Sequence, residues 1–426
     1  MQPEAAGYAD AGVLVRDAFR SFLPPRRITV AQHAAKHRWL KSPTGAHLER
    51  FDHRTAPYLR DPMDALSSDH YLAVALVGPG QCGKTVVGEN WLLQSIDADP
   101  ADLLWYMQTD PGVQSYVKGR IEPMLDHHAE LLRDRRLGPE SIAFKRFRGM
   151  RAEFLSFTHS NLINKSAARI VADEVDAYDQ TLGDAKALLD VRRQAAGLDS
   201  RLLAMSHPDL ATGMNPALDW QRGIMAIYGQ SDRRTWWWAC PYCGAFSSPN
   251  PGTPRQMILH YTPDAPLETV EAEARLLCPV NGCLINDGER LAMLQTGRWV
   301  AQGETCESDG RITGQRVPRT TAGFWIVGVM SPFILGGIGA LARGRVAAER
   351  ELEVTGEDAS LRTVMVKGWG HVYSPPRQVG AVEAAVLAER ARPDLVLGVV
   401  PDGVRVLTAS VDVQGNRFEL LVRGWG

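Results

Sequence analysis

The feature that most constrains the fold is a glycine-rich octapeptide at residues 78–85, Gly-Pro-Gly-Gln-Cys-Gly-Lys-Thr. It fits the pattern G-x-x-x-x-G-K-[ST] at every position, follows an apolar run at 72–77 and precedes a helical pattern. Glycines let backbone N–H groups curl around phosphates, and the start of the helix adds partial positive charge. A chance glycine turn with a capping threonine would not need both flanking elements. The segment therefore predicts a nucleoside triphosphate site in an α/β domain.

The octapeptide assigns roles to its own residues. Gly78 and Gly83 open the loop for the phosphates, Lys84 is expected to reach the β- and γ-phosphates, and the Thr85 hydroxyl to ligate Mg²⁺. Cys82 contributes its backbone, and we assign its thiol no redox role.

A second motif, Arg-Ile-Val-Ala-Asp-Glu at 169–174, ends an apolar run with two acids. Asp173 at the end of a buried strand can hold Mg²⁺, and Glu174 can polarise the attacking water as general base. An Asp-Glu pair is usually the solvated start of a helix. The phosphate loop upstream makes a catalytic role the favoured interpretation of this pair. Asp176 and Asp179 read as first-turn acids that complement a helix dipole. Ser206 either senses the γ-phosphate or simply ends a strand before a turn.

Short apolar runs alternate with helical patterns from residue 71 to residue 204, which is typical of a doubly wound α/β sheet. The expected fold is a P-loop NTPase with a parallel sheet of the additional-strand, catalytic-glutamate type. Strands are expected at 72–77, 103–107, 154–157, 170–172 and 202–205.

Four of the six cysteines form two pairs, Cys240-x2-Cys243 and Cys278-x4-Cys283, separated by 34 residues. Such knuckles predict a structural zinc ribbon with four thiolate ligands, because tetrahedral zinc takes paired cysteines at short spacing. The first knuckle is tight and the second is looser. Four unrelated buried thiols are the alternative.

With 426 residues, several domains are expected. We divide the chain into five parts. They are an N-terminal helical arm (1–50), an ATPase domain (51–235), a zinc-ribbon module (236–300), a linker or helical region (301–400) and a first nuclease hairpin (401–426). The net charge of −2 means that DNA would be held by local patches such as 133–136 and 145–148, although charge runs are usually solvated faces. Residues 322–342 lack charge, yet their glycines and proline favour a buried strand at 323–330 over a membrane span.

Several segments in a fixed order resemble the large terminase subunit of tailed bacteriophages, in the lambda-like GpA group. They cover most of the chain and include Thr-Ala-Pro-Tyr at 55–58, Pro-Met-Asp-Ala at 62–65, Leu-Trp-Tyr at 104–106, Asp-Glu-Val-Asp-Ala-Tyr-Asp at 173–179, Gly-Arg-Trp at 297–299, Ser-Pro-Phe at 331–333 and the closing stretch from Asp412 to Gly426.

The resemblance implies an ATP-driven motor that packages double-stranded DNA into a procapsid in the host cytoplasm, with a metal-dependent nuclease. It implies a small terminase subunit, the portal and further copies of the chain as partners, the N-terminal arm contacting the small subunit. Tyr58 would stack on adenine and Ser206 would couple hydrolysis to movement. Asp412, in a β-hairpin, would be the first carboxylate of a ribonuclease-H-like nuclease, although a lone aspartate beside a turn is usually a hairpin residue.

The sequence also departs from the GpA pattern. Its phosphate loop has the general form, whereas lambda-like members often carry the basic residue nearer the start of the loop. Leu59 stands where many relatives have a glutamine that reads adenine, which puts base selectivity in doubt. Only the first nuclease hairpin is represented, so we expect this chain not to cut DNA.

Two other functions fit parts of the sequence. A helicase-like remodelling ATPase shares the core motifs, but it should carry a second α/β domain with further arginine motifs. A zinc-ribbon DNA-binding adaptor would bind nucleotide without turnover, which a complete set of Lys84, Asp173 and Glu174 argues against.

Overall fold

A computed structural model describes residues 28–42, 45, 47–138, 140–375, 398–414 and 417–426, and the single positions 10, 12 and 15. The chain divides into two units, 1–375 and 376–426, and each is described by itself. Before residue 28, the expected N-terminal arm is described only at the single positions 10, 12 and 15, and residues 376–397 of the expected linker lie outside the described residues.

The centre of unit 1 is a seven-stranded sheet in the order β17-β3-β8-β7-β4-β6-β5. Every neighbouring pair is parallel except β5 and β6. Its strands are β3 (Ala73–Val77), β4 (Leu103–Met107), β5 (Phe144–Phe147), β6 (Met150–Ser156), β7 (Arg169–Asp173), β8 (Arg201–Ser206) and β17 (Thr321–Trp325). The strand β8 lies between β3 and β7, which is the expected additional-strand order. The five expected strands are therefore present, with ends shifted by up to four residues.

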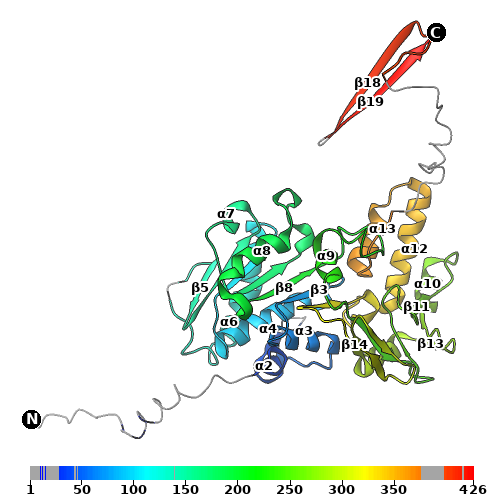
Figure 1. The fold of residues 1–426 in the computed structure, drawn as a ribbon. Helices are drawn as coiled ribbons and strands as arrows, with labels where there is room; N and C mark the ends of the chain where they lie inside the picture. The colour runs from blue at the N-terminus through cyan, green and yellow to red at the C-terminus, as the bar shows by residue number, and fades with distance from the viewer. Residues whose placement is uncertain are drawn as a thin grey trace, which may run out of the picture. The chain divides into compact units, whose positions relative to one another are not determined.

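Helices cover the sheet, which explains why β3, β7 and β17 are buried at every position. Figure 1 shows α2, α3 and α4 gathered beside the sheet. The helices are α2 (Val30–His37), α3 (Arg60–Leu66), α4 (Lys84–Asp97), α5 (Asp110–Tyr116), α6 (Glu122–His127), α7 (His159–Leu162), α8 (Ala185–Arg193), α9 (Gly223–Gly229), α10 (Leu267–Glu273), α11 (Asp287–Met293), α12 (Gly337–Thr355) and α13 (Ala359–Thr363).

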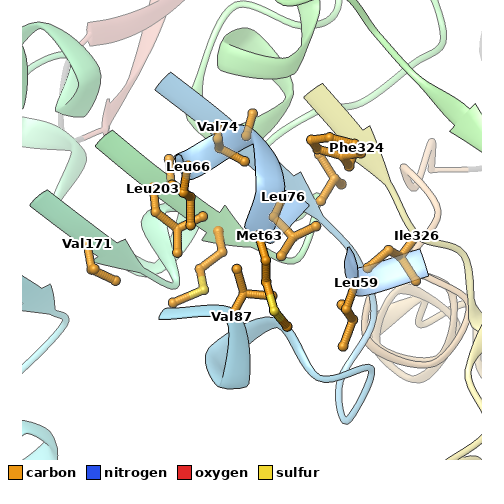
Figure 2. Close-up of a cluster of buried hydrophobic side chains, with 14 of the residues drawn as sticks. Leu59, Met63, Leu66, Val74, Leu76, Val87, Val171, Leu203, Phe324 and Ile326 are labelled. Atoms are coloured by element: carbon orange, nitrogen blue, oxygen red, sulfur yellow. The ribbon is translucent and has the colours of Figure 1, made fainter. Parts of the chain in front are cut away.

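The main core packs α3 and α4 onto the sheet. Figure 2 shows Met63 of α3 and Val87 of α4 turned toward Leu76 and Leu203 on the neighbouring strands β3 and β8. All four side chains are at most 1% exposed. Burying a side chain of this size contributes about 1.5–3 kcal/mol. The core therefore holds the start of α4 firmly against the end of β3, where the glycine-rich loop lies.

The region expected as a linker contributes to this sheet. The strand β17 pairs with β3 in parallel, with Thr321 opposite Ala73 and Trp325 opposite Val77. It corresponds to the buried strand expected at 323–330, although it ends at Trp325 and a 3-10 turn follows at Gly328–Met330. The boundary predicted at residue 301 is therefore wrong, because a strand beyond it completes the ATPase sheet.

The predicted N-terminal arm is only partly helical in its described portion. The helix α2 starts at a capping box of Thr29 and Gln32. It is followed by a hairpin of β1 (Trp39–Lys41) and β2 (Leu48–Arg50) rather than by more helix. Val30 and Ala34 are buried in the main core, so this part of the chain belongs to the body of unit 1.

Between α9 and β17 the chain forms small antiparallel sheets. One has the order β10-β9-β14, another β11-β12-β13, and β15 pairs with β16. The strands are β9 (Thr235–Ala239), β10 (Phe246–Ser247), β11 (Ile258–His260), β12 (Arg275–Leu277), β13 (Leu284–Ile285), β14 (Arg298–Val300), β15 (Glu304–Cys306) and β16 (Ile312–Gly314). Figure 1 shows α12 running beside α10, where Val270 and Val346 share a small core.

Unit 2 contains one described hairpin, β18 (Val406–Gln414) and β19 (Arg417–Trp425). Its pairing is antiparallel and places Asp412 opposite Glu419. A hairpin was expected here, and its residues 415 and 416 lie outside the described residues. Among the helices that the structure describes, none is both long and apolar enough to cross a bilayer.

Candidate nucleotide site

The glycine-rich loop connects the end of β3 to the first turn of α4. Gly83 has φ of 89°, and a Cβ at this position would come within 2.7 Å of the Leu59 side chain. Glycine is therefore required both for the left-handed backbone and for space. Lys84, the first residue of α4, is buried, and its Nζ donates to the carbonyls of Gly78 at 3.0 Å and Pro79 at 2.6 Å. Thr85 follows in the same turn and is half-buried.

The acidic pair lies at the end of β7. Asp173 is buried, and burial together with the neighbouring Glu174 charge raises its pKa to about 7. Its Oδ1 is buried and accepts no hydrogen bond from the described residues. An unsatisfied buried carboxylate oxygen is costly by itself, so this atom fits a ligand to a cation. Thr85 and Asp173 therefore suit a magnesium ion held with a nucleotide.

Glu174 has a left-handed backbone, with φ of 53°. Such a conformation costs a non-glycine residue about 1–3 kcal/mol and is concentrated at functional sites. Burial alone would raise the pKa of Glu174, but a hydrogen bond from His207 and the positive charge of Lys84 outweigh it, so the pKa is lowered. Glu174 is therefore held as a carboxylate, the form that a general base requires.

Two residues at the end of β8 contact this carboxylate. The Ser206 hydroxyl donates to Glu174 Oε2 at 3.4 Å and accepts from the backbone N–H of Asp176 at 3.1 Å. His207 Nδ1 lies 2.7 Å from the same Oε2. The other ring nitrogen faces the glycine-rich loop, since a Cβ at Gly80 would lie 3.6 Å from it. The imidazole therefore lies between the carboxylate and the loop.

His207 was not a predicted site residue, because in sequence it is only the first residue of the turn His-Pro-Asp. The signal that was available is its position directly after a strand that neighbours β7. In a parallel sheet, side chains at the carboxyl ends of adjacent strands meet at one edge. The rule that singled out Ser206 at the end of its strand applies equally to His207, the residue that follows it.

The prediction that Asp176 complements a helix dipole is wrong. Its carboxylate is buried and accepts from three backbone N–H groups, those of Asp209 and Leu210 at 2.9 Å and of Ile224 at 2.6 Å. Asp176 therefore fixes the segment that follows Ser206 and His207. A 3-10 turn at Val175–Ala177, rather than an α-helix, follows the acidic pair.

Tyr58 does not fit the predicted adenine-stacking role. Its ring is fully buried and packs edge-to-face against Trp236, so it presents no face to a base. Its hydroxyl donates to the Cys82 carbonyl at 3.0 Å, and burial raises its pKa well above the usual value. Tyr58 therefore supports the glycine-rich loop from the protein interior. Burial also raises the pKa of the Cys82 thiol, which keeps it protonated.

Residues beyond β17 hold the same loop from another direction. Gly80 N–H donates to the Lys367 carbonyl at 2.8 Å, and the Ser331 hydroxyl donates to the Gln81 carbonyl at 3.3 Å. A Cβ at Gly370 would lie 2.7 Å from Pro79. Part of the region 301–400, predicted as a linker, therefore forms one wall of the loop.

The four paired cysteines come together in space. Their sulfur atoms all lie within 4.8 Å of one another, with Cys243 and Cys278 Sγ 3.8 Å apart. One pair lies in the turn between β9 and β10, and the other lies between β12 and β13. The two knuckles have the same backbone hydrogen bond. The Gly244 N–H donates to the Cys240 carbonyl, and the Gly282 N–H donates to the Cys278 carbonyl, both at 2.9 Å. The second knuckle is therefore as closed as the first, and the donor set fits tetrahedral zinc.

The remaining sequence-predicted residues belong to other elements. Asp412 is on β18 in unit 2. In the basic runs, Lys145 is 3% exposed and pairs with Glu122 at 2.7 Å, and Arg136 pairs with Asp126 and Glu140. These two cations are therefore already neutralised within the fold.

Comparison with known proteins shows two matched family profiles. The family described as "Phage terminase large subunit gpA, ATPase domain" matches residues 45–299, and "Terminase large subunit gpA, endonuclease domain" matches residues 321–426. The second match starts at β17, a strand of the central sheet.

The chain is also similar to two curated terminase large subunits. It is 24% identical to that of Escherichia phage lambda over 435 residues, covering 97% of this chain and 63% of the relative. It is 22% identical to that of Enterobacteria phage P21 over 459 residues, covering 100% of this chain and 64% of the relative. The chain thus spans less than two thirds of the length of either relative.

Among solved structures, the HK97 bacteriophage large terminase has a TM-score of 0.36 and 14% identity, covering 48% of this chain and 40% of that chain. The Thermus phage P74-26 large terminase ATPase domain has a TM-score of 0.28 and 14% identity, covering 35% of this chain and 64% of that chain. Because the ATPase-domain profile matches more than half of its residues, this chain belongs to the gpA family of phage terminase large subunits.

Proposed function

We propose that this chain is the ATP-hydrolysing motor subunit that drives double-stranded DNA into a viral procapsid. The observation that carries the proposal is the arrangement at one edge of the central sheet. Lys84 and Thr85 follow β3, Asp173 and Glu174 end β7, and Ser206 ends the intervening strand β8. Membership of the gpA family supports DNA as the substrate on which this ATPase acts.

Each of these residues has a proposed role in ATP hydrolysis. The backbone N–H groups of the loop and Lys84 would bind the phosphates of ATP, and Thr85 and Asp173 would hold Mg²⁺, which neutralises the charge of the phosphates when bound. Glu174, kept ionised, would orient the attacking water and accept its proton. The Ser206 hydroxyl contacts both Glu174 and the backbone of Asp176. A movement of Glu174 during hydrolysis would therefore be transmitted through Ser206 to the segment after β8.

The two alternatives predict different observations. A helicase-like ATPase needs a second α/β domain, but within the described residues 28–375 the strands outside the central sheet form only short antiparallel sheets. A DNA-binding adaptor would bind ATP and leave it intact. The contact of Glu174 with His207 and its lowered pKa, which keep it a carboxylate beside Lys84, favour turnover over the adaptor.

Replacing Glu174 with glutamine tests the motor. Glu174→Gln should lower steady-state ATP hydrolysis by about 10²–10⁴-fold, because the amide cannot accept the proton of the attacking water. Nucleotide binding, measured with a fluorescent ATP analogue, should survive. Linear double-stranded DNA should stimulate the wild-type rate and leave the variant inactive.

Asp179→Asn is the matched control, because Asp179 is an exposed acid close to Glu174 in sequence. It should hydrolyse ATP at the wild-type rate. Equal rates for Glu174→Gln and the wild type would remove the general-base role. ATP binding without turnover, with or without DNA, would favour the adaptor.

We also propose that His207 is a positioning residue for Glu174. Its Nδ1–H hydrogen bond at 2.7 Å holds the carboxylate, and its ring lies beside the loop at Gly80. His207→Ala should lower kcat by about tenfold or more, since a small displacement of a catalytic group is costly. The KM for ATP should stay near the wild-type value, because the phosphate contacts remain.

His207→Asn should restore part of the lost kcat, because an amide N–H can donate to the carboxylate from a similar place. A rise in KM without a fall in kcat would mean that His207 only supports the loop. Steady-state kinetics of the wild type and the two variants separates these outcomes.

We propose that Cys240, Cys243, Cys278 and Cys283 bind a structural zinc ion. Cys243→Ser should remove one zinc per chain, measured by inductively coupled plasma mass spectrometry, and should lower the thermal midpoint. Cys306→Ala should retain the zinc, because Cys306 lies outside the cluster. Unchanged zinc content in Cys243→Ser would contradict the assignment.

Endonuclease activity is the second function that the family profiles support, with Asp412 as its proposed first carboxylate. Two-metal hydrolysis needs several carboxylates around the ions, and the described part of unit 2 is a single hairpin. We expect no cleavage of linear or plasmid DNA by this chain in Mg²⁺ or Mn²⁺. Cleavage that Asp412→Ala abolishes would contradict this expectation.

The proposed setting follows from the motor function. The active form would be a homo-oligomer at the portal of a procapsid in the bacterial cytoplasm. The N-terminal arm, residues 1–50, would contact the small terminase subunit. Both assignments rest on the family resemblance.

A further inference from the structure

A second cluster of metal-ligand side chains lies away from the nucleotide and cysteine sites. His33 and His37 are four residues apart on α2, so they share one face of the helix. Asp97, the last residue of α4, faces them. One ligand atom from each of the three residues lies within 4.8 Å of the other two. The cluster therefore joins the first described helix to the end of the helix that begins with Lys84.

The geometry of the cluster is fixed by packing. His33 is 1% exposed, and its Nε2 lies 3.0 Å from Asp97 Oδ2. The rings of His33 and His37 have centroids 4.9 Å apart and are tilted by 40°. His37 and Asp97 are half-buried. Ligands that lie about 2 Å from a tetrahedral zinc ion are about 3.4 Å from one another. The 3.0 Å between His33 Nε2 and Asp97 Oδ2 is close to that spacing, and all three ligand atoms lie within 4.8 Å of one another.

The simplest alternative is a histidine–aspartate bridge that docks α2 on α4. Such a bridge needs only two groups, the His33 Nε2 and the Asp97 carboxylate. The cluster instead brings three ligand atoms together, one of them from a second imidazole on the same face of α2. Three converging donors are the number that an open zinc site uses.

We propose that His33, His37 and Asp97 form a binding site for a divalent transition metal ion, with zinc as its natural occupant. Two imidazoles and one carboxylate are a donor set that suits zinc and related ions, and they are poor ligands for magnesium. Three protein ligands leave one position of a tetrahedral ion for water or for a further group.

The ion would fasten α2 to the far end of the phosphate-loop helix. The helix α4 has 14 residues and is about 20 Å long. The site therefore lies outside the ATP site, and the two sites are connected by one rigid element. Loss of the metal should loosen α2 and leave the ligands of ATP in place.

Zinc content of the whole chain tests the site without reference to ATP hydrolysis. The wild type, His37→Ala, Asp97→Asn and the control His47→Ala are dialysed against zinc-free buffer and analysed by inductively coupled plasma mass spectrometry. His47 is a suitable control because its side chain is 64% exposed and pairs with Glu49 outside the cluster. We expect His37→Ala and Asp97→Asn each to hold one zinc fewer per chain than the wild type and His47→Ala.

The cysteine cluster is common to all four proteins, so the difference between them reports only the histidine–aspartate site. Added Zn²⁺ should raise the thermal midpoint of dialysed wild type by more than that of His37→Ala. Far-UV circular dichroism shows whether each variant is folded, and His37→Gln replaces His37→Ala if that variant unfolds. Equal zinc content in all four proteins, or zinc lost from the wild type during dialysis, would overturn the proposal. Neither result bears on the ATPase assignment.

Discussion

The register of three parallel strands determines where the reactive groups of this protein can be. Val77 lies opposite Ser206 across the β3–β8 pair, and Asp173 lies opposite Met205 across the β8–β7 pair. The three strands therefore end at nearly the same level, so the residues that follow each strand lie at the same edge of the sheet. A shift of one residue would turn the alternating side chains to the opposite face. The buried core on both faces prevents such a shift.

A fully buried aspartate connects the central sheet to the antiparallel sheets beside it. Asp232 accepts from the Gly323 N–H at 2.9 Å and from the Arg234 guanidinium at 2.9 Å, and the Tyr71 hydroxyl lies 3.2 Å away. The chain departs from the sheet at this point and returns at β17 almost ninety residues later. Both carboxylate oxygens of Asp232 have partners, so its buried charge is paired. The segment between Asp232 and β17 therefore begins and ends at the same polar cluster.

Local patterns in the sequence predicted the elements whose signals are local. The strand expected at 103–107 has those bounds, and the cysteine spacings predicted a cluster that the fold assembles. The glycine-rich loop was identified because its conformation requires particular residues at adjacent positions. In each case the information lies within a few residues of the element that it specifies.

The features that were missed depend on contacts between distant residues. A buried strand was expected at 323–330, but its pairing with β3, which sets Thr321 opposite Ala73, has no local signature. The segment was therefore placed in the linker region and not in the ATPase sheet. Tyr58 looks like an accessible aromatic until Trp236 is packed against it. Asp176 resembles any acid in a first helical turn, and its three backbone donors come from more than thirty residues away. Burial decides the role of such residues, and burial is a property of the assembled fold.

The hydrogen bond from Gly80 N–H to the Lys367 carbonyl has a mechanical consequence. Residues 364–375 are the last described residues of unit 1, and they touch the phosphate loop before the chain continues to unit 2. A change in the shape of this loop would therefore alter its contacts with the last described segment of unit 1, at Lys367 and Gly370.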